Sequence, residues 1–546
     1  MPARITSPPS AARRLGAWGF EGHETEVKPT LAAWLDSRLG AERAPLPRLD
    51  REALQPLPEP RSLPELGCET SIEPLDRLTH ARGQGLTDLL RLRTGTVPAV
   101  PDAVARPTDD DQVETLLRVA AQHDVRIIPF GGGTSVTGGV NVIADDRPTI
   151  SVDLERLATV EALDDKAGLV TAGAGIRGPA LEAALQAKGL TLGHFPQSFE
   201  LSTLGGWIVT RSSGQESLGY GGIEDLTAGV ELIAPGGRLV VPALPRSAAG
   251  PDLRAMVLGS EGRYGIVTRA TMRVRDFPHH QRVEAALAED WSWGVELARA
   301  LTRERVPLTM LRLSDTPETQ VAMAAGLGGG FKGAVVRNVL RLRGIGREAC
   351  LLLFGAAGGT DQVDGTFETV RLLARRHRTK WLGASPGKTW QRDRFHHPYL
   401  RDALLDRGIA TDTLETAVPW SSVQRVYDAV RKALGDDDKV PVLCHLSHPY
   451  LDGTSLYFTW FFPVDADVDV TSARWAEVKR RASRALVETG ATISHHHGVG
   501  SWHAPWLADE TGDLGHRMLA SVANELDPSG VLNPHVLLDP TDRLER

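Results

Sequence analysis

The chain has 546 residues, 41% of them apolar and 24% charged, and its formal net charge is −8. That length is too great for one hydrophobic core and predicts two or three domains. The acidic balance argues against a nucleic-acid-binding protein, which is ordinarily basic, so no nucleic-acid partner is expected. No apolar run is long enough to span a membrane, and the three cysteines lie too far apart for a zinc ribbon or a disulfide framework. A cytoplasmic location is therefore expected.

The N-terminal part, residues 1–95, is rich in Pro, Arg and Leu. We expect an extended arm and short helices that pack on the domain that follows. In residues 96–278, strand and helix signals alternate, which predicts an α/β domain. Within it, residues 108–123 carry a helical apolar stripe with Thr108 as the expected cap, and residues 125–130 (VRIIPF) have strand character.

Residues 279–488 have a different pattern, in which long polar helices separate short strands. This predicts an α+β cap domain with an antiparallel sheet. The turn-rich segment 489–546 is expected to return to the domain formed by residues 96–278. The helices are expected at 291–303, 362–377 and 421–434, and the strands at 308–313, 350–354 and 455–462.

The strongest local signal is the segment Pro129–Val136, PFGGGTSV, directly after the strand at 125–130. Consecutive glycines allow positive φ angles and a close approach of the backbone to a ligand. Successive backbone N–H groups can then form a nest that binds an anion such as a pyrophosphate, with hydroxyl donors from Thr134 and Ser135. The spacing is not that of a Walker A loop.

A second glycine motif, Gly173–Gly178, matches G-x-G-x-x-G after a strand-like segment. A Rossmann fingerprint also needs an acidic residue at the end of the next strand, about 20 residues further on. The segment from Leu190 to Gln197 has none. We therefore interpret this motif as a tight strand-to-helix turn.

Further segments combine glycines with hydroxyl donors, a composition that suits a large polar ligand lying along the backbone. They are GHFPQS at 193–198, STLGG at 202–206, TRSSG at 210–214 and GSEG at 259–262, the last leading into YGIVT.

The series GGGTSV, GHFPQS, STLGGW, TRSSG, GSEGRYGIVT and DPSGVLNP resembles the FAD-linked oxidase family of the vanillyl-alcohol-oxidase and p-cresol-methylhydroxylase fold. Within it, the chain is most similar to the alkyldihydroxyacetonephosphate synthases, which install the ether bond of ether lipids. The resemblance covers most of the chain. It implies an α+β protein with a two-lobed FAD-binding domain at 96–278, a cap with an antiparallel sheet at 279–488, and non-covalently bound FAD, because no motif places a histidine for covalent attachment.

The resemblance also implies roles for individual residues. Tyr457 is the expected acid/base residue, and Arg401 the expected substrate-binding residue. Arg312, His194, His495, His496 and His497 are expected to line the reacting centre. The expected cofactor-binding residues are Pro129, Gly131, Gly132, Gly133, Thr134, Ser135, Val136, Gln197, Ser198, Ser202, Thr203, Gly206, Thr210, Arg211, Ser212, Ser213, Glu261, Gly262, Gly265, Ile266 and Val267.

In that family, the reaction exchanges the acyl group of acyl-dihydroxyacetone phosphate for a long-chain alcohol through an adduct at flavin N5. A tyrosine base near neutral pH needs nearby positive charge, for which Arg401, Arg312 and a protonated histidine are candidates. The planar fork of Arg401 suits a phosphate. Two positions depart from the family pattern near the expected site: Gln197 stands where the family often has Asp, and Ser501-Trp502-His503 lacks the expected basic residues.

Alternatives remain at this point. An FAD-dependent oxidoreductase of a 2-hydroxy acid such as lactate or glycolate would share every flavin motif, whereas a flavin-binding protein without catalysis is disfavoured by Tyr457, Arg401 and the histidines. No acidic partner is spaced for a zinc set with the triple histidine, so no metal is expected. The segment 326–346 mixes glycines, basic and apolar residues, which suggests a gate or a peripheral membrane-docking element as readily as an ordinary helix and loop. A homodimer is expected by analogy alone.

Overall fold

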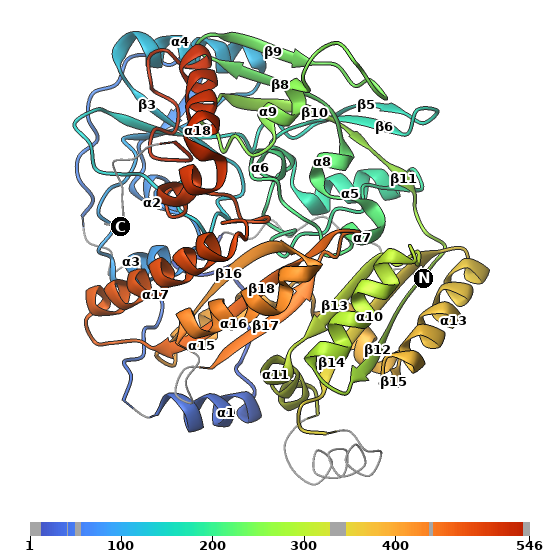
Figure 1. The fold of residues 1–546 in the computed structure, drawn as a ribbon. Coiled ribbons are helices and arrows are strands. Elements are labelled where there is room, and N and C mark those ends of the chain that lie inside the picture. Colours follow the sequence, from blue (N-terminus) through green and yellow to red (C-terminus); the bar gives the residue numbers. More distant parts are fainter. Residues whose placement is uncertain (1–12, 41, 50–55, 328–345, 436–440, 539–546) are drawn as a thin grey trace.

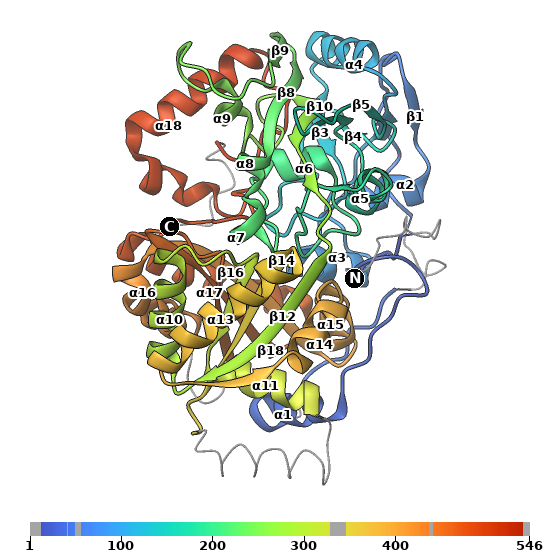
Figure 2. The same ribbon diagram turned by 90° about the vertical axis from the view of Figure 1, so that its right-hand side faces the viewer.

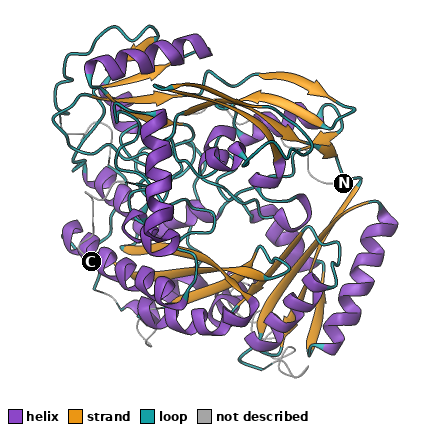
Figure 3. Ribbon diagram, turned by 45° about the horizontal axis from the view of Figure 1, so that its top comes forward, coloured by secondary structure: helices purple, strands orange, loops and turns teal. Residues whose placement is uncertain are grey.

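The computed structural model describes residues 13–40, 42–49, 56–327, 346–435 and 441–538. The chain forms two parts that lie one above the other in Figure 1. The upper part, here called the first domain, contains the strands β1–β11, and the lower part, the cap, contains β12–β18. The strands of the two parts form separate groups (Figure 3). The segment 326–346 falls almost entirely outside the described residues.

The first domain contains a four-stranded and a five-stranded sheet, besides the short antiparallel pair of β7 (Leu190–Thr191) and β11 (Arg275–Asp276). In the four-stranded sheet, β2 and β3 each pair in parallel with β4, and β1 pairs with β2 in the antiparallel sense. The five-stranded sheet is antiparallel throughout. The first sheet has the order β1 (Glu69–Ser71), β2 (Ala103–Arg106), β4 (Thr149–Asp153), β3 (Arg126–Phe130), and the second the order β5 (Val160–Asp164), β6 (Leu169–Gly173), β10 (Ile266–Arg273), β8 (Thr227–Ala234), β9 (Gly237–Val241).

Helix α4 (Asp110–His123) begins two residues later than expected. Its N-cap is Asp109, whose carboxylate accepts the Gln112 N–H at 2.9 Å, while the Gln112 side chain accepts the Thr108 N–H at 3.0 Å. The expectation that Thr108 caps the helix is therefore wrong. An adjacent carboxylate is the stronger acceptor for the unpaired N–H groups of the first turn.

The G-x-G-x-x-G motif forms the turn between β6 and α5 (Gly178–Gln186). A Cβ atom at Gly173 would lie 2.2 Å from the Leu157 carbonyl oxygen, and one at Gly175 would lie 1.7 Å from that of Leu154. These glycines are required because another part of the backbone passes within contact distance. The interpretation as a tight turn agrees with this packing.

The cap contains the expected antiparallel sheet, which has seven strands. Helices α10 (Trp291–Arg303), α13 (Thr360–Arg376), α16 (Val423–Leu434) and α17 (Val468–Thr489) cover one face, and α14 (Ser385–Asp393) and α15 (His397–Leu405) lie on the other (Figure 2). The strand order is β15 (Thr379–Gly383), β12 (His280–Ala288), β14 (Cys350–Gly358), β13 (Met310–Ser314), β17 (Val442–Ser447), β18 (Gly453–Pro463), β16 (Ile409–Pro419).

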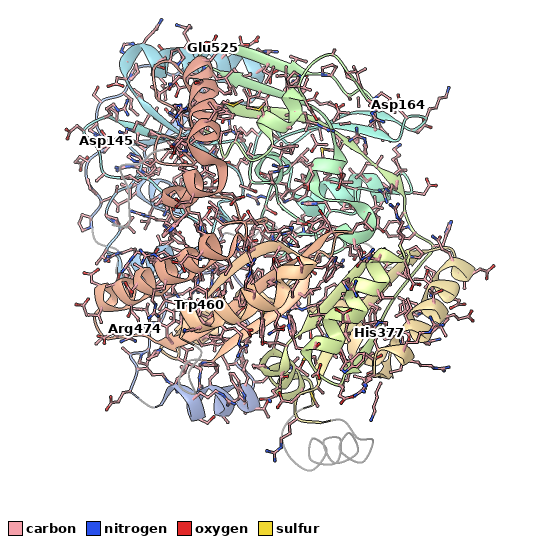
Figure 4. All side chains as sticks on the ribbon, viewed as in Figure 1. Asp145, Asp164, His377, Trp460, Arg474 and Glu525 are labelled. Atoms are coloured by element: carbon pink, nitrogen blue, oxygen red, sulfur yellow. The ribbon has the colours of Figure 1, made fainter. Side chains whose placement is uncertain are left out.

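Strand alternation separates an apolar and a polar face in the centre of this sheet. Leu456 and Phe458 of β18 belong to the core beneath the four helices, as does Trp460 (Figure 4), whose ring lies 5.6 Å from the Lys479 ammonium. Tyr457 and Thr459 alternate with them and point to the opposite face. The same alternation places His445 of β17, Glu415 of β16 and Arg312 of β13 on the face that carries Tyr457.

The N-terminal arm contains a helix, α1 (Pro29–Leu39). Its Leu31 and Leu35 pack with Leu404 and Phe461 of the cap, so α1 lies below the cap sheet in Figure 1. The expected packing of this arm on the first domain thus does not apply to α1. Before the helix, the buried Arg14 lies 3.3 Å from Asp402 of α15.

The C-terminal segment crosses back to the first domain. Helix α18 (Leu507–Leu526) follows the cap, and the chain then reaches β3, where the N–H of Ile127 donates to the carbonyl of Val531 and the N–H of Asn533 donates to that of Ile127. The Asn533 amide donates to the carbonyls of Gly139 and Glu261 at 2.9 and 2.8 Å. Within the described part of the chain, no helix is both long and apolar enough to cross a bilayer.

Candidate active site

The glycine loop after β3 offers a row of unused backbone donors. Among the described residues, none accepts a hydrogen bond from the N–H groups of Gly131 to Val136. Gly133 has a φ of +61°, and a Cβ at Gly132 would lie 2.2 Å from the Leu201 carbonyl oxygen. Buried polar backbone groups are normally paired. A crowded loop of this kind with free donors fits a bound pyrophosphate.

The loop faces the N-terminus of helix α6 (Leu204–Val209). Thr203 caps this helix by accepting the Gly206 N–H at 3.3 Å, and its hydroxyl oxygen would lie 2.3 Å from a Cβ at Gly131. Ser202 accepts the Trp207 indole N–H at 2.7 Å. Glycine at position 131 therefore allows the glycine loop to contact the STLGG segment at 202–206.

Gly132→Ala is expected to abolish FAD retention while the cap still folds, because the added methyl group overlaps the backbone of Leu201. The measurement is the ratio of flavin to protein absorbance after gel filtration. The matched control is Gly365→Ala in α13, where the added methyl group meets no atom within 4 Å. Retention of flavin by Gly132→Ala at the wild-type ratio would contradict the assignment of this loop.

The other expected cofactor residues differ in how their side chains are used. The Gln197 amide donates to the Arg394 carbonyl at 2.6 Å, which ties this segment to the cap. Thr210 donates to the Gly206 carbonyl at 2.8 Å, and Arg211 has a φ of +51°. Ile266 begins β10. The remaining members keep only backbone or hydroxyl groups for a ligand: Ser198, Ser212, Ser213, Gly262, Gly265 and Val267.

Glu261 uses its carboxylate within the protein. It accepts the N–H groups of Val499 and Gly500 at 2.6 and 2.7 Å, which fixes the C-terminal segment beside the glycine loop. Burial raises the pKa of Glu261 to about 7, although the two N–H donors lower it. The side chain of Glu261 is therefore already engaged within the protein. Its contact with the cofactor stays a prediction, and only the backbone of Glu261 is left to make it.

Tyr457 stands at the centre of an aromatic cluster on the polar face of the cap sheet. Its ring stacks on that of His445 with centroids 4.8 Å apart, and the rings of His496 and His497 lie 6.0 and 5.4 Å away. Burial raises the pKa of Tyr457 to about 12, and the Thr413 hydrogen bond and the Arg312 charge offset this only in part. The expectation that positive charge lowers this pKa is not met, so Tyr457 is a protonated phenol near neutral pH.

The triple histidine is anchored by Glu415, which sequence reasoning missed. This carboxylate is 2% exposed and accepts the backbone N–H groups of His495, His496 and His497 at 2.7, 3.1 and 3.0 Å, and the Ser494 hydroxyl at 2.8 Å. Although burial opposes ionisation, the histidines hold the pKa of Glu415 well below its usual range. A fixed anion thus holds the backbone of the three histidines, and the rings of His496 and His497 lie beside Tyr457.

Arg312 belongs to a second ionic group beside Tyr457. Its guanidinium lies 2.8 Å from Glu318 and 3.1 Å from His445 Nδ1. Burial favours a protonated Glu318, but Arg312 and His445 keep the pKa of this carboxyl below its usual range. Arg312 therefore positions His445 against the Tyr457 ring.

Arg401 of α15 contacts Gln84, which lies just before helix α3 (Leu86–Thr94). Its guanidinium donates to the backbone carbonyl and the side-chain oxygen of Gln84, while its Nε is buried without a partner among the described residues. Burial lowers the pKa of Arg401, and Tyr457 is among the groups whose charge acts on it. An incompletely satisfied guanidinium here fits the predicted anchoring of an anion.

His194 does not join the other histidines. It is 1% exposed, its ring contacts Trp207 at 4.8 Å, and its Nε2 lies 3.1 Å from the Ser212 hydroxyl. Burial lowers its pKa to about 3. Because His194 is buried, it can affect a ligand only through a neighbouring residue, here Ser212.

Two further histidines lie near these groups, and the ring of His448 is 5.3 Å from those of His495 and His496. His448, with a φ of +47°, lies 2.8 Å from Ser217 and 3.2 Å from Ser213, and so joins the cap to the first domain. His397 is exposed, yet the protein around it lowers its pKa to about 4 by burial. The charges of Arg312 and Glu318 also act on His397.

Glu415, His495 and His496 each offer one ligand atom, and these atoms lie within 4.8 Å of one another. Both oxygens of Glu415 already accept hydrogen bonds. The His495 and His496 Nδ1 atoms are 2.8 Å apart, which is a hydrogen-bond distance. The group is thus complete as a hydrogen-bonded network.

The comparisons with known proteins agree with this geometry. Residues 101–241 match the FAD binding domain family, and residues 277–537 match the C-terminal domain of FAD linked oxidases. The fold is similar to that of p-cresol methylhydroxylase, with a TM-score of 0.65 at 14% identity over 86% of this chain and 93% of that one. Fold and site therefore define an FAD-dependent enzyme with a p-cresol-methylhydroxylase-type flavin domain and an α+β cap, as expected from the sequence.

A narrower family is also shown. The alkyldihydroxyacetonephosphate synthase of Dictyostelium discoideum is 34% identical over 86% of this chain and 78% of its own length. A solved structure of an alkyldihydroxyacetonephosphate synthase superposes with a TM-score of 0.80 at 28% identity over 96% of this chain and 98% of that one. A glycolate oxidase subunit of Bacillus subtilis is more distant, at 24% identity over 80% of this chain and 88% of that protein. The chain belongs to the alkyldihydroxyacetonephosphate synthase family.

Proposed function

We propose that this enzyme exchanges the acyl group of acyl-dihydroxyacetone phosphate for a long-chain alcohol, a step of ether lipid synthesis without net redox change. The observation that carries the proposal is the grouping of Tyr457 with the Glu415-anchored histidines, together with Arg401, on which the charge of Tyr457 acts. A hydroxy-acid dehydrogenase needs only a small cationic pocket. The present site contains, besides the cationic Arg401, an acid/base cluster formed by Tyr457 and the histidines.

FAD would be held by the glycine loop Gly131–Val136, by the Gln197–Thr203 and Thr210–Ser213 segments, and by the backbone at Glu261–Val267. When bound, the flavin supplies an electrophilic centre that stabilises the substrate carbon while its acyl substituent is replaced. No described side chain is placed for covalent attachment by a recognised motif. We expect acid precipitation to release the FAD into the supernatant.

The side chains of the chain itself perform the remaining tasks. Arg401 would bind the phosphate through a bidentate contact. Tyr457, protonated at neutral pH, would donate a hydrogen bond or a proton to a substrate oxygen. His496, whose Nδ1 lies 3.4 Å from Glu415 Oε2, would act as the base, and the adjacent carboxylate would hold its ring in place.

The test is anaerobic mixing of the yellow enzyme with palmitoyl-dihydroxyacetone phosphate and, separately, with D-lactate and glycolate. We expect release of palmitate, flavin that ends oxidised, and incorporation of hexadecanol when it is added. Bleaching of the flavin by a hydroxy acid, without palmitate release from the acyl phosphate, would reject the proposal in favour of the oxidoreductase.

The surroundings of the enzyme are part of the proposal as well. Three free cysteines support a reducing, cytoplasmic compartment. The lipid substrate motivates a peripheral contact with membranes, and the segment 326–346 is the candidate for it. Liposome co-sedimentation of the full chain and of a variant without this segment tests the contact, and sedimentation velocity tests the homodimer expected by analogy.

A further inference from the structure

A surface pocket of about 680 Å³ lies at the boundary between the two domains, where α7 (Ser217–Tyr220) meets the cap. Arg275, Leu308, Gly359 and the turn between β17 and β18 line it. Tyr450 of that turn is 40% exposed, and its backbone N–H donates to the Gly453 carbonyl at 2.7 Å. The Tyr450 ring is therefore held in place while one side of it faces solvent.

The hydroxyl of Tyr450, which lines the pocket, also contacts the histidine segment. Tyr450 Oη lies 2.6 Å from His495 Nε2, and His495 Nδ1 lies 2.8 Å from His496 Nδ1. His496 in turn adjoins Glu415 and the Tyr457 ring. His496, His495 and Tyr450 thus form a hydrogen-bonded row that runs from the Tyr457 ring to the partly exposed Tyr450.

The proposed reaction, on which this inference rests, needs such an exit. The bond between the substrate carbon and the acyl carboxylate breaks, and a bond from that carbon to the alcohol oxygen forms. A fatty acid ionises near pH 4 to 5, as a glutamate side chain does, so it leaves as a carboxylate. The hydroxyl proton of the alcohol is left over, and one proton per turnover must reach water from an enclosed site.

We propose that His496, His495 and Tyr450 conduct this proton to the surface pocket. The proton taken up at His496 passes to His495 Nδ1, the proton on His495 Nε2 passes to Tyr450 Oη, and the phenolic proton passes to water. Each transfer breaks one N–H or O–H bond and forms one at the next atom, so the number of protons in the row is unchanged afterwards. Burial lowers the pKa of His495 to about 4, so it is a neutral imidazole that can accept and donate at the same time.

The test is Tyr450→Phe, which keeps the ring and removes the relay atom. We expect kcat to fall on the order of 10- to 100-fold, within the range of proton-transfer contributions, with KM and bound flavin unchanged. Imidazole added as a diffusible base should restore the rate, whereas the wild type should not respond to it. The matched control is Tyr220→Phe in the wall of the same pocket, because no described residue hydrogen-bonds the Tyr220 hydroxyl.

A second measurement does not depend on turnover. After a pH jump on the resting holoenzyme, the flavin absorbance reports when protons reach the site, and we expect the response of Tyr450→Phe to be at least about 10-fold slower than that of Tyr220→Phe. Equal responses of the two variants, or a Tyr450→Phe variant that keeps the wild-type kcat and does not respond to imidazole, would overturn the relay. Absence of fatty acid release by the wild type would instead reject the proposed function, and the pH jump would still decide on the relay.

Discussion

Tyr457→Phe is expected to lose on the order of 10² to 10⁴ in kcat, the usual contribution of one acid/base group, while the protein stays yellow. The Tyr457 ring stacks on His445 and adjoins both His496 and His497. Phenylalanine keeps these ring contacts and removes only the hydroxyl. The measurement is single-turnover release of fatty acid from acyl-dihydroxyacetone phosphate, with the flavin spectrum recorded alongside.

The control for this variant is Tyr427→Phe. Tyr427 lies on the helix-covered side of the same sheet, where its hydroxyl donates to Asp315 at 3.1 Å, so its loss tests stability without touching the histidines. We expect wild-type turnover from it. Undiminished activity of Tyr457→Phe would remove this residue from the mechanism and leave His496 as the principal acid/base candidate.

Glu415→Gln is expected to reduce kcat/KM by at least about 100-fold, because the histidine segment loses the anion that orients it. The amide also presents N–H groups to a backbone donor, so one contact becomes unfavourable. A hydrogen bond to a charged group contributes about 1.5–3 kcal/mol, and a similar loss in the free energy of unfolding is expected. Activity assays and urea unfolding of the flavin-loaded protein measure the two effects.

The pH dependence of this variant follows from the depressed pKa of Glu415. A carboxyl whose folded pKa lies below its unfolded value of about 4.3 contributes stability above that value and loses it as the pH falls through the folded pKa. The stability difference between wild type and Glu415→Gln should therefore be constant from about pH 5 to 9 and shrink below about pH 4. A difference that grows on acidification would contradict an ionised Glu415.

The matched control is Glu284→Gln in β12, at the other end of the cap sheet. Glu284 is also buried, and it accepts hydrogen bonds from Arg371 and Trp381. We expect it to lose stability and keep activity. Equal losses of activity in both variants would mean that Glu415 supports only the sheet.

Local patterns predicted the parts of this molecule that depend on neighbouring residues. The patterns of the glycine loop, of helix α10 and of the alternating strand around Tyr457 each consist of residues that are adjacent in sequence. The structure places all three as expected. Glu415 escaped prediction because its partners lie 80 to 82 residues further along the chain. No residue near Glu415 signals that three backbone N–H groups will meet it.

The same distinction explains the errors. Thr108 and Asp109 are both good caps, and only the geometry of the first turn decides between them. The sequence of the arm at 13–40 does not indicate which domain the arm packs on. Its packing on the cap through Leu31 and Leu35 could therefore not be predicted. His194 shares a motif with flavin-binding residues, yet its rotamer directs the ring toward Trp207.

The C-terminal crossing has a consequence for biosynthesis. Asn533 closes the glycine loop from a position 394 residues after Gly139, and Ile127 pairs with Leu532 at the edge of β3. A ribosome that has translated the whole first domain has therefore not yet made the residues that complete its wall. FAD is therefore expected to bind only after the C-terminal residues have left the exit tunnel. A ribosome-bound nascent chain that ends before residue 499 should contain no bound flavin and be colourless.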